Sequence, residues 1–519
     1  MAFEGFTMSP PYGGLDLVSP IDNMDPAYAL ELVNVFPGAG SPTVRLGYTQ
    51  FADTSTTSAL PFSTTLNLAD GTSQLIVGTS NALYAINSAG AVTNITGAAT
   101  ITTGTWQSVT YNNRLYLCNG VDTPLVYNGT GTVSATTFTG PASMSSLINV
   151  HAHKERLYFA EANTAKVWYG GLQVTGTGGT PALTSFDLSY VFTRGGYIVG
   201  IGSYSNTTSM SVQDYFWAIS SEGEIVFYSG TYAGDPTTWG LVARYVIGKP
   251  LGYRAFVRVN NDVWILTAQG IVPLSGLFET DPEQATNIVS MRVNPLISFY
   301  AEQTTFDHQW AGFFWPQGRR VYISIPTSGS GCQFLVYAID TKGWTTFRLT
   351  NDQHLFSSCV FQNLPYYCSS TGIVWKGETG LADAVTSTDS QSILFSGRTA
   401  FSFYNSRGNF KAFKDIRPLI RTKRGVTLQL GLDTDFKRSQ TVASVTTPVG
   451  VFTPWGSTGG SPTYTPWGSA WSGDIDYVFD RYAVKGQGHC AAVRFGGTLK
   501  NSTLQIYGFE IRFDMGGQV

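Results

Sequence analysis

One short pattern recurs along this chain: a few alternating apolar and polar residues around a Tyr, Phe or Trp, then a polar turn, then a second such run. Residues 114–118, for example, are separated by Asn119-Gly120 from residues 124–127. Alternation places every second side chain on one face, and an Asn-Gly pair supplies the positive φ of a tight turn. Each copy therefore predicts a β-hairpin. Further copies occupy 81–86, 156–159 with 166–169, 224–228, 262–266, 320–324 with 334–337, and 365–368 with 373–375.

A hairpin cannot bury its apolar face alone, so hairpins in series must stack on one another. This requirement predicts an all-β protein that contains a β-propeller. The copies fall within residues 61–390, and at roughly 45 residues per four-stranded blade this length corresponds to six or seven blades. The spacing is irregular, because Leu83, Leu115 and Leu157 are 32 and 42 residues apart.

The two ends of the chain differ from the repeats. Residues 25–34 begin with an Asp cap and a Pro at the first helical position, which predicts a short helix. After residue 390, the runs at 426–430 and 503–507 alternate strictly, as strands do. We therefore expect a β-sandwich platform made from an N-terminal segment, 1–60, and a C-terminal domain, 391–519. The propeller would be inserted in this platform or attached to it, because the ends of an inserted propeller lie close together.

The composition limits the classes of protein that this chain can represent. Charged residues make up only 13% of the 519 residues, against roughly 25% in an ordinary soluble domain, which suggests a surface that partners cover. The net charge of −3 argues against nucleic-acid binding by bulk electrostatics. The five cysteines are scattered and odd in number, which favours free thiols in a reducing cytoplasm. The sequence shows neither a signal-peptide pattern nor an apolar run long enough for a membrane span.

Candidate chemistry is sparse. His151 and His153 are two residues apart, a spacing that puts both imidazoles on one face of a strand, as in some metal sites. The chain has only five histidines and no third ligand is apparent, so a polar strand end is favoured over a metal site. Asp340 and Trp344 are spaced as in kelch-type blades, where the Asp closes a turn and the Trp packs between blades. No catalytic motif is present, and we expect neither enzyme activity nor a cofactor.

One cluster of basic residues stands out in a chain with so few charges. It spans 398–424, where eight basic side chains accompany the single acid Asp415: Arg398, Arg407, Lys411, Lys414, Arg417, Arg421, Lys423 and Arg424. One interpretation is a solvated edge, where Lys and Arg block unwanted strand pairing. The other is a set of basic groups that face phosphates or an acidic neighbour. The residues occupy odd and even positions, so no one face of a strand holds them all. Four of them are predicted to lie at a subunit interface or near a lumen: Arg417, Arg421, Lys423 and Arg424.

A duplicated Pro-Trp-Gly turn, within 453–456 and 465–468, contains two further candidates. Trp is frequent among the residues that contribute most to protein contacts, which would make Trp455 and Trp467 interface residues. The two rings could equally pack under the sandwich. The sequence leaves both arrangements open.

The two ends of the chain carry a resemblance to a known family. The segments 32–37 (Leu-Val-Asn-Val-Phe-Pro) and 43–48 (Thr-Val-Arg-Leu-Gly-Tyr) resemble the opening of the tail nozzle, or tail-tube, proteins of short-tailed bacteriophages. Residues 486–489, 492–495 and 504–510 are similar to the closing strands of these proteins, and the hairpins between the two ends match their propeller. The motifs are short and degenerate, so they indicate fold context rather than a site, and the family brings no catalytic residues.

The resemblance implies a structural virion protein of the phage tail, made in the host bacterial cytoplasm. Copies of the chain would form a ring, usually sixfold, below the head-to-tail adaptor and in contact with tail proteins such as a fibre, spike or needle. Double-stranded DNA would pass through the lumen without sequence specificity, so a lumen lined with many basic groups is not expected. Two alternatives stay open: a fibre or spike propeller that binds or cleaves glycans, and a monomeric propeller for protein interactions. The glycan alternative needs clustered acids and aromatic residues at the propeller centre.

Overall fold

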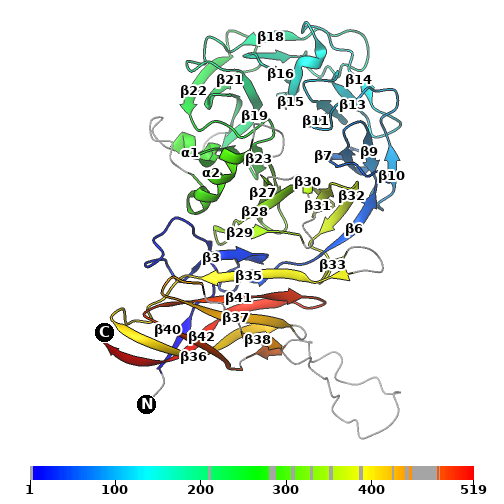
Figure 1. Cartoon of the computed structure of the whole chain (residues 1–519). Helices are drawn as coiled ribbons and strands as arrows, with labels where there is room; N and C mark the ends of the chain where they lie inside the picture. Colours follow the sequence, from blue (N-terminus) through cyan, green and yellow to red (C-terminus); the bar gives the residue numbers. More distant parts are fainter. Residues whose placement is uncertain are drawn as a thin grey trace, which may run out of the picture. The chain divides into compact units, whose positions relative to one another are not determined.

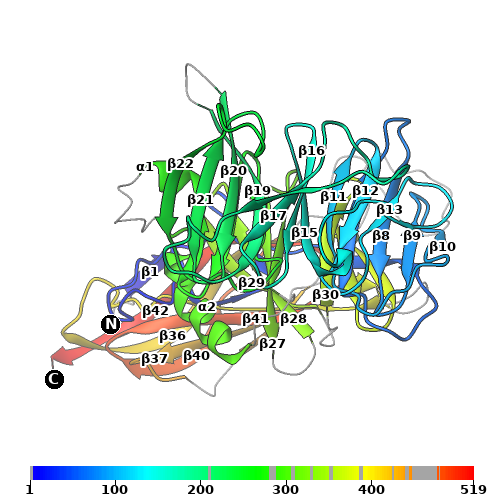
Figure 2. The same cartoon turned by 90° about the horizontal axis from the view of Figure 1, so that it is seen from above.

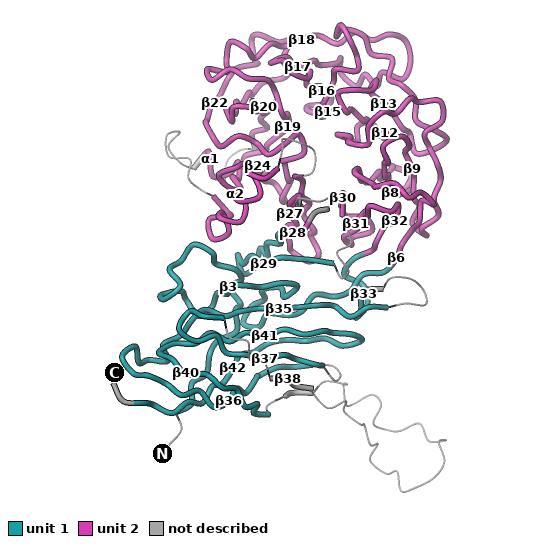
Figure 3. The backbone as a smooth tube through the Cα atoms, in the orientation of Figure 1, with its two compact units in different colours: residues 1–49, 335–352, 377–519 teal, residues 50–334, 353–376 magenta. Residues whose placement is uncertain are grey.

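Seven groups of antiparallel strands, called sheets below, follow one another in unit 2, one of the two units of the computed structural model (Figures 1 and 3). The first five groups are separate sheets, and the sixth and seventh are parts of larger ones. Unit 2 contains residues 50–334 and 353–376, and unit 1 contains residues 1–49, 335–352 and 377–519. The structure describes residues 4–207, 212–279, 288–304, 310–327, 331–349, 355–384, 390–422, 426–438, 443–446, 476–478 and 480–518.

The first four sheets of unit 2 each contain four antiparallel strands in up-and-down order. The first two sheets consist of β7 (Phe62–Asn67), β8 (Ser73–Gly78), β9 (Leu83–Ile86) and β10 (Val92–Asn94), then β11 (Gln107–Tyr111), β12 (Arg114–Cys118), β13 (Leu125–Tyr127) and β14 (Ser134–Ala135). The third and fourth consist of β15 (Leu147–His153), β16 (Arg156–Glu161), β17 (Lys166–Tyr169) and β18 (Thr184–Asp187), then β19 (Ile198–Thr207), β20 (Val212–Ser220), β21 (Glu224–Ser229) and β22 (Gly240–Val246). A short 3₁₀ turn, η1 (Met144–Ser146), precedes β15.

The last three sheets depart from the plain four-stranded form. They consist of β23 (Phe256–Val259), β24 (Asp262–Thr267) and β25 (Gly270–Pro273), then β26 (Ala311–Trp315), β27 (Arg320–Thr327) and β28 (Gly331–Ala338), then β30 (Leu355–Phe361), β31 (Leu364–Ser369), β32 (Ile373–Gly377) and β6 (Tyr48–Asp53). After β25 the chain forms α1 (Leu274–Glu279), η3 (Met291–Val293) and α2 (Asn294–Gln303). Leu274 and Leu277 of α1 are buried against Ile265, so this helix covers apolar surface of the fifth sheet.

The two faces of one sheet pack against different neighbours. In the second sheet, Leu115 and Leu117 of β12 share a core with Leu83 of the first sheet. Tyr116, which lies between them, shares a core with Phe159 of the third sheet. Burying one such apolar side chain contributes about 1.5–3 kcal/mol, so each sheet is stabilised from both sides. Stacked sheets of this kind form a β-propeller, the predicted architecture.

The ring closes with a strand from its beginning. β6, which precedes the first sheet in sequence, is the fourth strand of the seventh sheet, next to β32. Figure 1 shows the first strands, such as β7, β11, β15 and β19, toward the middle of the ring, and in Figure 2 β20 and β21 of one sheet run side by side. Seven sheets in the described residues agree with the six or seven blades expected. The predicted hairpins are confirmed where β12 pairs with β13, β16 with β17 and β31 with β32.

Unit 1 is built from two larger sheets and a short ribbon. One sheet contains β1 (Glu4–Met8), β4 (Val35–Phe36), β5 (Thr43–Val44), β36 (Asn409–Thr422), β39 (Asp476–Val478), β40 (Tyr482–Gly488) and β42 (Leu504–Gln518). The other contains β29 (Gly343–Phe347), β2 (Gly14–Leu15), β3 (Tyr28–Val33), β35 (Ile393–Thr399), β41 (Ala491–Leu499), β37 (Thr427–Thr434) and β38 (Ala443–Thr446). The ribbon pairs β33 (Asp383–Ala384) with β34 (Ser390–Gln391).

Both ends of the chain contribute to both large sheets. β1 pairs with β42, and β3 pairs with β35. The two sheets touch where the rings of Phe495 on β41 and Phe509 on β42 are 5.4 Å apart. The β-sandwich platform as a whole stays a prediction.

The helix predicted at 25–34 is wrong. Asp25 closes a turn instead, because its carboxylate accepts a hydrogen bond from the amide of Ala27 at 2.9 Å and its carbonyl accepts one from Tyr28 at 3.0 Å. The residues that follow form β3, in which Ala29 and Leu32 are fully buried. Pairing on both edges of β3 and burial of these two residues outweigh the local helix signal.

The unit boundaries also differ from the expected domains. Residues 335–352 and 377–390, which the sequence analysis assigned to the propeller, belong to unit 1, and residues 50–60, expected in the N-terminal segment, belong to unit 2. Trp344 on β29 is buried beside Tyr337 of β28, with ring centres 4.8 Å apart, and β29 pairs with β2. No helix among the described residues has the length and apolar character that crossing a membrane requires.

Candidate functional site

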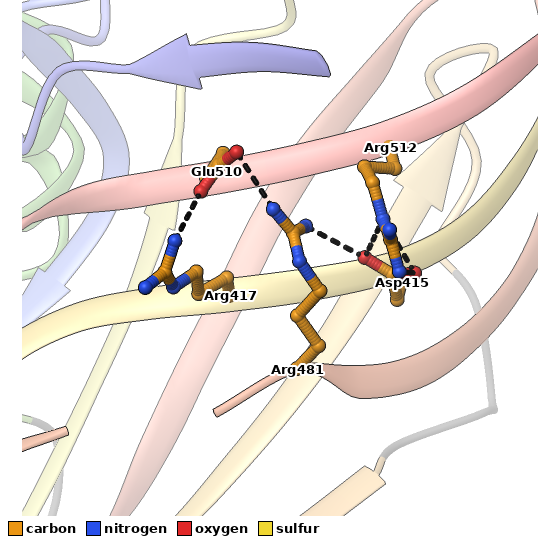
Figure 4. A network of polar contacts seen from close by, with 5 residues as sticks. All are labelled: Asp415, Arg417, Arg481, Glu510 and Arg512. Atoms are coloured by element: carbon orange, nitrogen blue, oxygen red, sulfur yellow. Dashed lines mark hydrogen bonds and ion pairs between the residues drawn. The ribbon is translucent and has the colours of Figure 1, made fainter. Parts of the chain in front are cut away.

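Five charged side chains form a network on one face of β36 and β42 (Figure 4). Asp415 and Arg417 come from β36, Glu510 and Arg512 from β42, and Arg481 directly precedes β40. Asp415 is opposite Arg512 and Arg417 is opposite Glu510 in the antiparallel ladder. Each acid thus faces a guanidinium across the strands, an arrangement that stabilises strand pairing.

The contacts in this network are short. Arg512 donates from Nη2 to Asp415 at 2.6 Å and from Nε to both carboxylate oxygens at 3.0 Å. Arg481 bridges the acids, at 2.9 Å from Asp415 and 2.7 Å from Glu510. Arg417 lies 3.2 Å from Glu510. Bidentate pairs in a shared network are stronger than isolated surface pairs, which contribute about 0–1 kcal/mol.

The two acids of this network are ionised at neutral pH. Burial raises the pKa of Asp415, but hydrogen bonds from Arg512 and Arg481 outweigh burial and hold this pKa below its usual value. The bond from Arg481 is the main reason why the pKa of Glu510 is lowered, with Arg417 adding to it. Three guanidiniums therefore face two carboxylates, and only one positive charge is left over.

The predicted basic site is only partly described. Arg417 belongs to the network, and Arg421 is half-buried further along β36. The remaining predicted residues lie outside the described part of the chain: Lys423, Arg424, Trp455 and Trp467. Their place at a subunit interface or lumen stays a prediction.

Other basic residues of the 398–424 cluster have partners within unit 1. Lys414 pairs with Asp514 at 3.1 Å, Arg398 lies 3.5 Å from Asp433, and Arg407 lies 3.7 Å from Asp22. Lys411 is fully buried, and its ammonium donates to the carbonyls of Asn409 at 2.9 Å, His489 at 2.8 Å and Ser406. These residues make contacts within unit 1. This result fully matches neither the solvated edge nor the set of basic groups facing phosphates or an acidic neighbour.

A β-bulge explains why the odd-and-even rule does not hold along β36. The bulge lies between Phe413 and Asp415. Before it the odd positions Lys411 and Phe413 are buried, and after it the even position Ile416 is buried while Asp415 and Arg417 share the polar face. One extra residue in a strand exchanges its two faces. Sequence reasoning also missed Arg481, Glu510 and Arg512. These residues lie far along the chain from 398–424, and no local pattern connects them with the basic cluster.

The residues of the N-terminal signature form a buried polar site. Arg45 donates two hydrogen bonds to Asp383, at 2.7 and 2.6 Å, and the two side chains are 1% and 0% exposed. The guanidinium also lies over the rings of Phe347 and Tyr48, 5.1 and 5.8 Å from their centres. Sequence reasoning did not identify Asp383, which is more than 300 residues away from Arg45.

Asn34 and Gly47 complete this polar site. Asn34 has a φ of 58°, its side chain donates to Leu394 at 2.7 Å and accepts from the amide of Arg348 at 2.9 Å, and its carbonyl accepts from Arg45. A Cβ on Gly47 would lie 1.8 Å from the carbonyl oxygen of Ala382, so only Gly fits there. Asn34, Arg45 and Gly47 thus make structural contacts within unit 1.

The two histidines lie on one face, as predicted. Both hydrogen-bond with the hydroxyl of Ser203, His151 at 3.0 Å and His153 at 2.7 Å. Burial, then the charges of His153 and Arg258, lowers the pKa of His151 to about 3. Burial, then the charge of Lys154, lowers the pKa of His153 to about 4. Within the described residues no group of three possible metal ligands occurs.

The centre of unit 2 contains a cavity of about 520 Å³. Its wall includes residues from the first strand of every sheet of the ring, which are β7, β11, β15, β19, β23, β26 and β30. Small polar side chains such as Ser108 and Ser203 alternate with rings such as those of Trp217 and Phe256. The only charged side chains among its described lining residues are those of Arg254 and Arg258.

No protein-family model matches the chain, and none of the curated proteins matches it. Similar solved structures include a streptogramin B lyase, with 11% identity, a TM-score of 0.41, and coverage of 63% of this chain and 96% of that chain. They also include the WD40 β-propeller domain of Doa1 (11%, 0.38, 64% and 96%) and BamB from Moraxella catarrhalis (10%, 0.32, 66% and 93%). At such scores these similarities carry no argument about activity, and the propeller assignment rests on the sheets themselves.

Proposed function

We propose that this chain is the tail nozzle protein of a short-tailed bacteriophage. In this proposal six copies form a ring below the head-to-tail adaptor. The ring retains packaged DNA and conducts it during ejection. The observation that carries the proposal is the make-up of unit 1. Segments 32–37 and 43–48, which resemble the family's opening, belong to the same unit as β40, β41 and β42, which resemble its closing strands.

The buried contacts of the N-terminal signature support this reading. Asn34, Arg45 and Gly47 each make a contact that a different residue type would lose. The contacting residues Leu394, Asp383 and Ala382 lie in segments that follow the first six sheets. A family that keeps an inserted propeller needs such residues to join the two parts of its outer unit. The resemblance would then reflect a shared way of building unit 1.

The small size of the propeller cavity favours a DNA channel formed by several copies of the chain rather than a channel through a single chain. A cavity of about 520 Å³ has the size of a small-molecule site. The major groove of B-DNA alone is about 12 Å wide, so a duplex cannot enter such a cavity. A DNA channel in this protein must therefore lie between copies of the chain.

The charge balance of unit 1 is also suited to DNA that must move. Affinity for DNA rises with every phosphate that a Lys or Arg neutralises, so a strongly basic channel would hold the genome back. In the described part of the 398–424 cluster, Arg398, Arg407, Lys414 and Arg417 all have carboxylate partners. Neutralised basic residues leave little net attraction for phosphate.

Electron microscopy of the purified protein, together with light scattering, tests this proposal. We expect annular particles with a mass six times that of one chain, and only weak, salt-sensitive binding of duplex DNA. A monomer at every protein concentration would contradict the ring, and DNA binding tighter than about 1 μM at physiological salt would contradict the conduit. Release of reducing sugars or binding on a glycan array would favour the fibre or spike alternative instead.

A further inference from the structure

The cavity in unit 2 has charged groups of one sign in its wall. Arg254 is held in place, because it donates to the carbonyl of Pro61 at 2.6 Å. Arg258 on β23 is exposed and makes no hydrogen bond or ion pair with the described residues. No Asp or Glu occurs among the described lining residues. No described lining residue therefore supplies a counter-charge for Arg258.

A buried hydrogen-bond donor without an acceptor lies in the same wall. Trp217 is 3% exposed, and its indole N–H has no partner among the described residues. A Cβ on Gly202, another lining residue, would lie 2.4 Å from Cζ2 and 2.8 Å from Nε1 of this indole. The indole of Trp217 thus lies against the backbone of Gly202, in the space that a side chain there would fill, and its ring forms part of the wall.

The rest of the wall suits a flat apolar group. Phe256 packs on Trp217 with ring centres 5.2 Å apart, and Phe313 and Phe314 also line the cavity. The volume of about 520 Å³ falls within the roughly 300–1,000 Å³ typical of sites for small molecules. His151, although it lines the cavity, is neutral and bonded to Ser203, so it adds no charge.

We propose that the central cavity of unit 2 binds a small organic anion, in which a carboxylate or a phosphate monoester is attached to a planar ring. Arg258 supplies the charge that attracts the anionic group, because guanidinium groups match carboxylate and phosphate oxygens. The aromatic wall, which includes Trp217 and Phe256, contacts the ring of the ligand. This site is separate from the DNA conduit proposed above and does not depend on it.

Titration calorimetry with the full chain tests the proposal, with benzoate and phenyl phosphate as the two anionic probes. Benzyl alcohol and benzylamine have the same ring with a neutral or positive group. We expect at least one anion to bind and both controls to bind much more weakly. Comparison of the two anions shows whether carboxylate or phosphate is preferred. Equal binding of benzylamine, or no binding of either anion at millimolar concentration, would overturn the proposal.

Two variants locate the site. Arg258→Gln should weaken anion binding roughly tenfold or more, since a charge-assisted hydrogen bond is lost. Phe256→Leu keeps an apolar side chain but removes a ring from the wall, and should weaken binding by about two- to tenfold. Arg114→Gln, on β12 and outside the cavity wall, is the matched control and should bind as the original chain does. If Arg258→Gln and Arg114→Gln bind alike while both keep the original melting temperature, the site is not this cavity.

Discussion

The buried pair of Arg45 and Asp383 allows a quantitative test of how unit 1 is held together. Asp383→Asn removes the negative charge but keeps the shape of the side chain and one acceptor oxygen. Arg45 would keep its bonds to the carbonyls of Leu46 at 3.0 Å and Arg348 at 3.2 Å. Its charge, however, would be left without a carboxylate at a site where its side chain is 1% exposed.

Breaking a buried ion pair by removing one partner costs about 3–5 kcal/mol, because the remaining charge is desolvated. The remaining carbonyl bonds and the rings of Phe347 and Tyr48 lessen this cost, so we expect Asp383→Asn to lower the free energy of unfolding of unit 1 by about 3 kcal/mol. A double variant, Arg45→Met with Asp383→Leu, removes both charges and should recover most of the loss, since apolar replacements of buried pairs are often neutral.

Hydrogen exchange across a urea series, with peptides from β3 and β35 as reporters, measures the stability of unit 1 separately from that of unit 2. The matched control is Arg438→Gln, which removes a surface pair with Glu31 at 3.7 Å in which both side chains are at least 36% exposed. This control should change stability by less than about 1 kcal/mol. An Asp383→Asn effect no larger than the control, or a double variant as unstable as the single one, would refute the reasoning.

Three further predictions concern other charged groups. The pKa of His153 is lowered, mainly by burial, from 6.5 to about 4, so below pH 6.5 the unfolded chain takes up a proton that the folded chain does not. In urea unfolding, His153 should contribute about 2 kcal/mol to the fall in stability from pH 8 to pH 5, in addition to the part from His151, and His153→Asn should remove that contribution. Arg481→Gln should cost about 1 kcal/mol at low salt and clearly less in 1 M NaCl, because it bridges Asp415 and Glu510 in a half-exposed network. Lys411→Met leaves three carbonyls without their donor and should lower the melting temperature far more than Lys414→Met, whose surface pair is worth less than about 1 kcal/mol.

The architecture of unit 2 could be predicted because its signals are local. Alternation over five residues and a turn such as Asn119-Gly120 define a hairpin without any knowledge of the rest of the chain. Strands such as β12 are buried on both faces, with Leu115 and Tyr116 in different cores. A hairpin with two apolar faces must pack against a neighbour on each side. This requirement predicts stacked hairpins and therefore the propeller.

The architecture of unit 1 depends on contacts that a single sequence does not reveal. The partner of Arg45 is 338 residues away, and Asp25-Pro26 has the form of a helix start although β3 follows it. In β36, one bulge residue exchanges the buried and exposed positions, so the basic cluster cannot be assigned to faces by counting. Each of these predictions failed for the same reason. The residues that determine the local structure lie on a strand that is distant in the sequence.

This difference determines which residues of the chain can be exchanged without loss of the fold. In unit 2, any apolar residue of suitable size can fill a position between two sheets, so its repeats share a pattern but few identities. In unit 1, segments more than 300 residues apart must find one another, and Asn34 and Arg45 provide directional contacts with Leu394 and Asp383 that apolar residues cannot replace. Residues that specify a distant pairing tolerate little change, whereas residues that only fill a core tolerate much. Substitutions at Asn34 and Arg45 should therefore cost more stability than most exchanges between apolar residues of unit 2.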